Sequence, residues 1–146
     1  TLNPSSAASD VYKRQIAQSL EYISKVTFKH INNNHKALTF NQIRELKEIS
    51  LQLETLFERT KFAFSKNNFK EISNILDSKQ QLLESIREKI DNQISRTKSE
   101  ESSPKNTTLY FSLLTETKDL IKANMAMLEL YDEQYDSNIE PPSANE

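Results

Sequence analysis

The chain has 146 residues, of which 36% are hydrophobic and 27% are charged, and it contains no glycine, cysteine or tryptophan. Glycine supplies the positive-φ backbone that phosphate-binding loops need, so its absence excludes Gly-rich nucleotide sites and tight hairpin turns. The lack of cysteine excludes disulfides, thiolate metal sites and cysteine nucleophiles. With 19 basic and 21 acidic residues well mixed, the net charge of −2 provides no broad basic field for nucleic acid or anionic lipid.

Hydropathy patterning predicts helices and neither strands nor membrane spans. No apolar run approaches the roughly 18 residues that indicate a transmembrane helix. The chain has only two valines, and its apolar residues never alternate over a strand-length stretch. Every longer segment instead repeats apolar residues at three- and four-residue spacing, which is typical of amphipathic helices.

Residues 1–15 lack this period, and we expect them to be a disordered, non-native segment. Their end, DVYKRQ at Asp10 to Gln15, resembles the in-frame translation of the transposon end used to fragment DNA for sequencing. That resemblance implies that the gene was read from a fragment and that the natural protein continues upstream of Ile16. The alternative is an ordinary polar N-terminal extension.

The first two predicted helices span residues 16–32 and 40–66. Asparagines at 32–34 end the first helix, because asparagine tolerates the left-handed conformation. Thr39 and Gln42 form a capping box that begins the second. The stripe of the first helix comprises Ile16, Leu20, Ile23, Thr27 and Ile31, and that of the second comprises Ile43, Leu46, Ile49 or Ser50, Leu53, Leu56 or Phe57, Thr60 and Phe64.

The next two predicted helices span residues 69–98 and 104–135. Asn68, with Glu71 three positions later, is the expected cap of the third helix. Ser103 precedes Pro104, a residue tolerated at the first helical position. The tail at 136–146 lacks periodicity, and we expect it to be disordered.

Short connections between helices of matched length predict an all-α fold, an antiparallel up-down helical bundle. The last three helices share one core in this interpretation. The first helix packs beside them as the remnant of a preceding unit.

The sequence predicts no catalytic, cofactor-binding or metal site. A di-iron bundle needs Glu-x-x-His pairs on two helices, and neither His30 nor His35 belongs to one. His35 is expected to be an exposed or capping loop residue. No serine lies in a Gly-x-Ser-x-Gly turn, because there is no glycine.

One acidic group lies near the end of the last predicted helix, on one face of it. These carboxylates could chelate a hard cation if another helix added oxygens. We favour a solvated, fraying turn, because acids at a helix C-terminus oppose the macrodipole and repel one another. The group comprises Glu129, Asp132, Glu133 and Asp136.

Four polar residues fall at core-like positions in the stripes: Thr60, Lys79, Thr117 and Asn124. A buried polar residue can fix helix register, whereas one at the margin reaches water. We assign a register role to Asn124 and a marginal position to Lys79.

Two segments resemble the C-terminal cytosolic region of bacterial sodium-phosphate cotransporters, which is PhoU-like. The first is NNHKALT at residues 33–39, followed by QIRELKEI at 42–49. The second is NTTLYFSLLTETKDL at 106–120, which is similar to the final helix of the family. Thr107 stands where serine is usual, and Asp119 where asparagine is typical.

The resemblance covers about residues 16–135 and implies a PhoU-like three-helix repeat plus one preceding helix. It implies a non-catalytic regulatory or docking module on the cytoplasmic face of the bacterial inner membrane. Its partner would be the upstream membrane transporter domain or a cytosolic regulatory protein, without nucleic acid and without a cofactor. Of the acidic metal-binding motifs of PhoU proteins, only Asp132-x-x-x-Asp136 is present, so no metal ligands are assigned.

Two other functions stay open. The chain could be a free-standing helical-bundle interaction protein that self-associates as a homo-oligomer. An enzyme is the weakest alternative, since it needs a metal or substrate pocket that no motif specifies.

Overall fold

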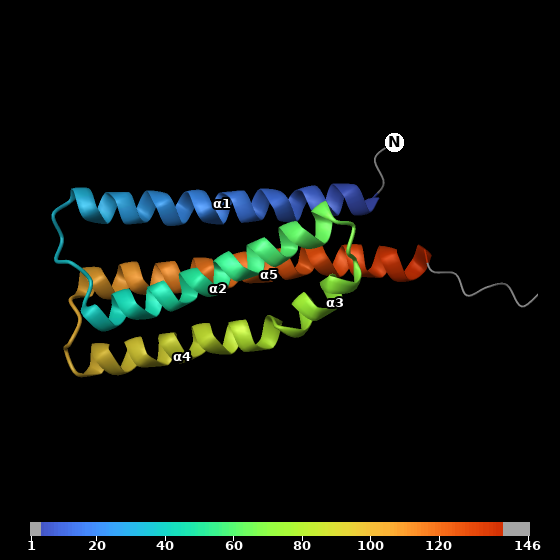
Figure 1. The fold of residues 1–146 in the computed structure, drawn as a ribbon. Helices are drawn as coiled ribbons and strands as arrows, with labels where there is room; N and C mark the ends of the chain where they lie inside the picture. The colour runs from blue at the N-terminus through green and yellow to red at the C-terminus, as the bar shows by residue number, and fades with distance from the viewer. Residues whose placement is uncertain (1–3, 139–146) are drawn as a thin grey trace, which may run out of the picture.

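The computed structural model describes residues 4–138, with side chains from 7 to 134. These residues form five α-helices and no strand. Figure 1 shows that α1, α2, the α3–α4 pair and α5 run in alternating directions, which confirms the all-α up-down bundle. The helices are α1 (Pro4–Asn32), α2 (Phe40–Ser65), α3 (Lys70–Asp77), α4 (Lys79–Lys98) and α5 (Pro104–Asn138).

Both ends of the described chain are more helical than the sequence predicts. Helix α1 begins at Pro4, so the prediction of disorder over residues 1–15 is wrong for residues 4–15. This segment packs along α5, where the hydroxyl of Ser9 lies 3.1 Å from the hydroxyl of Tyr131. Helix α5 continues to Asn138, so residues 136–138 are helical too. The remainder of the predicted tail, 139–146, lies outside the described residues.

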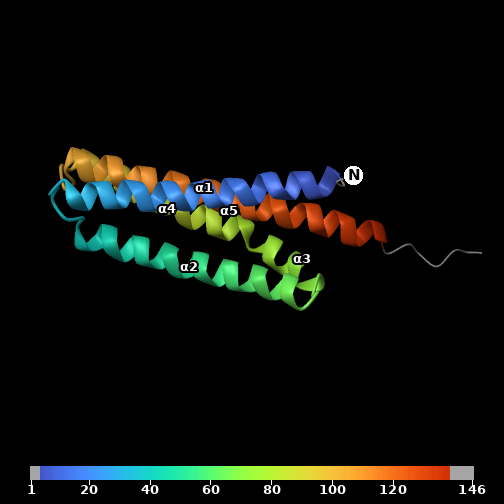
Figure 2. The same ribbon diagram turned by 90° about the horizontal axis from the view of Figure 1, so that it is seen from above.

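The predicted stripe of the first helix is only partly buried. Leu20 and Ile31 are 45% and 68% exposed, whereas Ser9 and Ser19 are buried. Helix α1 lies along α5, beside the bundle (Figures 1 and 2). A helix with one principal neighbour buries a narrow face, and small side chains there allow close approach. The hydrophobic pattern therefore identified the helix over residues 16–32, but neither its start at Pro4 nor its contact face.

The main core lies between α2, the α3–α4 pair and α5. Leu114, Met125 and Leu128 of α5 are fully buried in it, as are Ile72 and Ile75 of α3. Phe64 and Tyr131 meet edge to face, with ring centroids 4.7 Å apart. The three long segments thus share one core, as the matched lengths predict.

A bend at Ser78 divides the predicted third helix into α3 and α4. The Ser78 hydroxyl donates to the carbonyl of Ile75 at 2.5 Å, and its backbone N–H donates to the same carbonyl at 3.0 Å. Serine that bonds back to the preceding turn bends helices. The prediction of one uninterrupted helix over residues 69–98 is therefore wrong at Ser78.

Helix ends follow the predicted chemistry with one exception. The capping box of Thr39 and Gln42 is present, and the Ser103 hydroxyl accepts from the backbone N–H of Asn106 at 3.2 Å. The predicted Asn68 cap is wrong, because Phe69 occupies the N-cap position and makes no side-chain cap bond. Glu71 instead accepts from Arg59.

Left-handed residues close three of the helices in a chain without glycine. Asn34, Asn67 and Glu100 have φ of 53°, 50° and 58°. After Asn67 and Glu100, the next backbone N–H reaches back to Ala63 and Arg96, respectively. This geometry is the Schellman ending that glycine usually provides.

Replacing Glu100 with glycine is expected to raise the free energy of unfolding by about 0.5–1 kcal/mol. Left-handed backbone costs a non-glycine residue about 1–2 kcal/mol, and the greater freedom of unfolded glycine offsets part of the gain. Urea denaturation measures the change. Glu101→Gly is the matched control, because Glu101 has no positive φ, and it should stabilise nothing. Equal gains in both variants would contradict this explanation.

Candidate functional site

The two histidines lie together at the α1–α2 connection. Their rings are 5.0 Å apart, and His30 Nε2 lies 3.3 Å from the carbonyl oxygen of Lys36. Among the described residues, no group of three or more histidines, aspartates and glutamates is placed to hold a metal ion. His35 is half-buried against His30 rather than free in solvent. The two histidine rings therefore pack against each other at the turn between α1 and α2.

The acidic group at the end of α5 does not fray over the described residues. Glu129 pairs with Lys79 of α4 at 3.4 Å, and Asp132 is half-buried. The helix continues through Asn138, so the prediction of a fraying turn is wrong there. The side chain of Asp136 lies outside the described ones.

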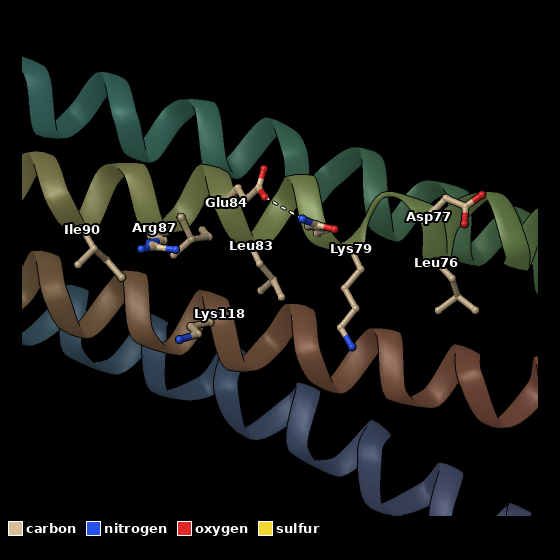
Figure 3. A pocket seen from close by; sticks show the side chains of 10 residues that line it. Leu76, Asp77, Lys79, Leu83, Glu84, Arg87, Ile90 and Lys118 are labelled. Atoms are coloured by element: carbon tan, nitrogen blue, oxygen red, sulfur yellow. Dashed lines mark hydrogen bonds between the residues drawn. The ribbon is translucent and has the colours of Figure 1, made fainter.

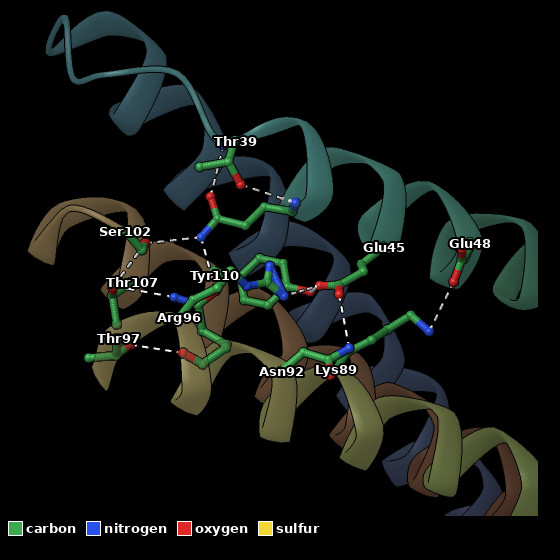
Figure 4. A network of polar contacts seen from close by, with 12 residues as sticks. Thr39, Glu45, Glu48, Lys89, Asn92, Arg96, Thr97, Ser102, Thr107 and Tyr110 are labelled. Carbon is green, nitrogen blue, oxygen red and sulfur yellow. Dashed lines mark hydrogen bonds and ion pairs between the residues drawn. The ribbon is translucent and has the colours of Figure 1, made fainter. Parts of the chain in front are cut away.

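The largest polar cluster is one that sequence reasoning missed, and it is buried at the loop end of the bundle (Figure 4). Glu45 of α2 is its centre, with 5% of its surface exposed. Arg96 of α4 donates to this carboxylate at 2.5 Å, Asn92 donates at 3.0 Å, and the Tyr110 hydroxyl of α5 donates as well. The guanidinium of Arg96 also lies 5.3 Å from the centre of the Tyr110 ring. One carboxylate thus joins three helices.

A second layer of the cluster consists of uncharged groups. Gln42 donates to Gln93 at 3.0 Å and to the Ser102 hydroxyl at 3.1 Å. Gln93 in turn donates to Thr107 at 3.3 Å, and Thr107 bonds to Ser102. Because Gln42 also belongs to the capping box, the start of α2 is tied to the α4–α5 connection.

A third layer lies toward the middle of the bundle. Lys89 is 5% exposed, and its ammonium group lies 3.2 Å from the Glu48 carboxylate and 3.2 Å from the Ser85 hydroxyl. Ser85 donates to Gln52 at 3.2 Å. The cluster therefore runs down the α2–α4 interface as paired groups.

The sequence contains a pattern that indicates this cluster, but hydropathy alone does not reveal it. After Ile86, the inward positions of α4 continue at helical spacing as Lys89, Gln93 and Arg96. On α2, Gln42 and Glu45 occupy the inward positions, and Ile43 is 52% exposed. Polar residues that extend an apolar stripe in register on two helices would have indicated a buried polar layer.

The hydroxyl of Tyr110 keeps its proton over an extended pH range. Burial raises its pKa far above the ordinary value, and the hydrogen bond to the Glu45 carboxylate raises it further. The unfolded chain releases this proton near pH 10 while the folded chain retains it. Since the unfolded state then binds fewer protons, stability is present below the unfolded pKa and declines as pH rises above it.

We expect the free energy of unfolding to fall more steeply between about pH 9 and pH 11 in the wild type than in Tyr110→Phe. Urea titrations across this range measure both slopes. Tyr22→Phe is the control, because Tyr22 is 43% exposed and should leave the slope unchanged. Identical slopes for wild type and Tyr110→Phe would contradict the assignment.

Of the four polar residues predicted in the stripes, three are buried. Asn124 donates to the Thr60 hydroxyl at 3.2 Å, and both residues are less than 10% exposed. The Thr60 and Thr117 hydroxyls donate to carbonyls in their own helices. Lys79 lies at the margin, as predicted, in its pair with Glu129. The register role of Asn124 stays a prediction, now with Thr60 as the named partner.

A hollow of about 790 Å³ lies beside the polar cluster, where the α1–α2 and α4–α5 connections meet. Asn106 lines it and is 3% exposed, and its amide donates to the carbonyl of Ala37 at 2.9 Å. Hydroxyl groups form most of the polar lining, and its charged residues are Lys36, Glu100 and Glu101. One cation and two anions leave this lining with an excess of negative charge, which disfavours an anion.

A groove of about 630 Å³ lies between the α3–α4 pair and α5. Figure 3 shows Leu83 and Ile90 directed toward α5, with Asp77 and Glu84 directed away. Lys118 reaches the groove from α5. The groove therefore combines an apolar wall with three cations, Lys79, Arg87 and Lys118, and contains no nucleophile paired with a base.

Comparisons of the chain with protein-family models, with curated proteins and with solved structures found no match. None of the described helices has the length and hydropathy needed to cross a membrane. The described residues thus define a helical bundle with an apolar core and, at the end where the α1–α2 and α4–α5 connections lie, a buried cluster of polar side chains.

Proposed function

We propose that this chain is a PhoU-like cytosolic module of a sodium-dependent phosphate cotransporter. Its role is regulatory or docking, through helix contacts with the membrane domain or a cytosolic protein on the cytoplasmic face of the bacterial inner membrane. In this proposal the module performs no chemistry of its own, because the buried charged side chains Glu45, Lys89 and Arg96 each form an ion pair.

One observation supports the proposal above the rest. The two segments that resemble the cotransporter family are far apart in sequence, yet they bond directly to each other. Tyr110 donates to Glu45 across 65 positions, and Asn106 donates to Ala37 across 69. Residues shared by a family are expected to meet where they hold a common fold together.

The gene locus tests this proposal. Amplifying the locus across Ile16 from source DNA, without a transposase step, should replace residues 1–15 with apolar segments of roughly 20 residues. Persistence of residues 1–15 with a nearby start codon would overturn the carrier assignment.

A transport assay tests the regulatory role once the full carrier is known. Cells producing the carrier without residues 16–135 should take up phosphate at a changed rate, while the amount of carrier in the membrane stays the same. A carrier with unchanged uptake and unchanged partners would contradict a regulatory or docking role.

The second candidate is a free-standing bundle that self-associates, and exposed apolar side chains favour it. Among the residues with described side chains, ten large apolar ones are between 41% and 78% exposed, including Phe28, Ile31 and Phe40. Such residues are normal when scattered but indicate an interface when they gather. The start codon near residue 1 that would overturn the carrier would support this alternative.

A further inference from the structure

One exposed strip of α5 bears two cations and two anions in a symmetrical order. We define the α5 ridge as Lys118, Lys122, Ala126, Glu129 and Glu133, which follow one another at three- and four-residue spacing on one helix face. The four charged residues are exposed, and Ala126 is half-buried. The cations lie on one side of the centre and the anions on the other.

The ridge faces away from α2, between α4 and α1. Lys118 lines the groove beside α4, and Lys122 and Ala126 line a second hollow, of about 470 Å³, beside α1. Two acids of α5, Glu116 and Asp119, also line this hollow but lie outside the ridge as defined. Glu129 pairs with Lys79 at the start of α4. Figure 3 looks onto this side, where α4, α5 and α1 lie next to one another. No other described helix covers the ridge.

Three of the four ridge charges have no ionic partner among the described residues. Lys118, Lys122 and Glu133 make no ion pair there, and the Glu129 side chain remains 50% exposed in its pair with Lys79. Within one copy, these charges are therefore poorly compensated.

We propose that a second copy of this chain covers the α5 ridge, in an antiparallel two-fold pair. Lys118 and Glu133 are equally far from the point between residues 125 and 126, as are Lys122 and Glu129. A two-fold axis at that point places Lys118 opposite the Glu133 of the second copy and Lys122 opposite its Glu129. Such an isologous contact repeats each pair, so two copies form four ion pairs.

The same geometry excludes the parallel arrangement. A two-fold axis along α5 would set Lys118 against Lys118 and Glu133 against Glu133, and like charges that face each other at an interface disfavour association. At the centre of the antiparallel pair, the small side chain of Ala126 lets the two helices approach closely. The apolar wall of Leu83 and Ile90 lies beside the ridge and adds surface that association would bury.

Charge reversal in sedimentation equilibrium of the full chain tests the pair. Lys118→Glu with Lys122→Glu makes the ridge wholly acidic, and Glu129→Lys with Glu133→Lys makes it wholly basic. Each double variant should self-associate about tenfold more weakly than the wild type, or worse. An equimolar mixture of the two variants should recover association, because every contact becomes complementary.

Lys47→Glu with Lys61→Glu is the matched control. Both lysines are exposed on α2, and the change in net charge equals that of the acidic ridge variant. Self-association of this control should equal that of the wild type. The self-association of the wild type should itself weaken as the salt concentration rises. Circular dichroism verifies that all variants remain helical.

Three outcomes would overturn the proposal: a wild type that is monomeric at every concentration, ridge variants that associate as well as the wild type, or a mixture that does not associate. The second of these would assign self-association to the exposed apolar residues instead. The proposed two-fold pair does not depend on the carrier proposal. The oligomeric state of the chain tests the two-fold pair, whereas the gene locus tests the carrier proposal.

Discussion

Replacing Arg96 with alanine is expected to lower the free energy of unfolding by about 3–5 kcal/mol. The side chains of Arg96 and Glu45 are 9% and 7% exposed, so removing the guanidinium leaves a buried carboxylate without its counter-charge. The hydrogen bonds from Asn92 and Tyr110 to Glu45 remain but do not neutralise it. Guanidinium chloride denaturation, followed by circular dichroism, measures the loss.

Arg59→Ala is the matched control for Arg96→Ala. Arg59 also pairs with a carboxylate, that of Glu71 at 2.7 Å, but the two side chains are 36% and 26% exposed. Solvent screens such a pair, so its removal should cost about 0–1 kcal/mol. If both variants lost the same amount, burial would not be the reason for the effect of Arg96. A loss below about 1 kcal/mol for Arg96→Ala would show that Glu45 finds another partner or water.

Truncating Leu114 to alanine is the second large effect we expect, a loss of about 2–5 kcal/mol. Leu114 is fully buried on α5, within the core that α2, the α3–α4 pair and α5 share. The change removes apolar contacts and leaves a cavity that long, capped helices close only in part. Urea denaturation at a single pH measures the loss.

Leu51→Ala removes the same atoms from an exposed position and serves as its control. Leu51 is 55% exposed on α2, so this variant should change stability by less than about 1 kcal/mol. Should Leu51→Ala cost as much as Leu114→Ala, the exposed side of α2 would itself be covered by another surface. In that case self-association would have to be measured at the same protein concentration.

Helix positions were predictable because their signals are local. The capping box at Thr39, the cap at Ser103 and the left-handed asparagines all act within one or two turns. The Ser78 bend and the missing Asn68 cap were not predicted, because serine occurs both inside helices and at bends, and Asn68 with Glu71 has the spacing of a cap although the helix begins after Phe69.

The buried polar cluster was not predictable from one helix at a time. Glu45 is 51 positions from Arg96 and 65 positions from Tyr110 in the sequence. Each of the three looks like a surface residue in its own segment. Burial of a charge is favourable only when an opposite charge arrives from another helix. The sequence shows the residues, but pairing across the bundle makes their inward positions stable.

The sequence alone determined an all-helical chain without glycine-dependent or cysteine-dependent chemistry, because composition and helical period act locally and need no partner. The tertiary structure decided which face each helix buries, that residues 4–15 pack on α5, and that one end of the bundle has a polar interior. These features depend on contacts between distant segments, whose energies exist only once the helices meet.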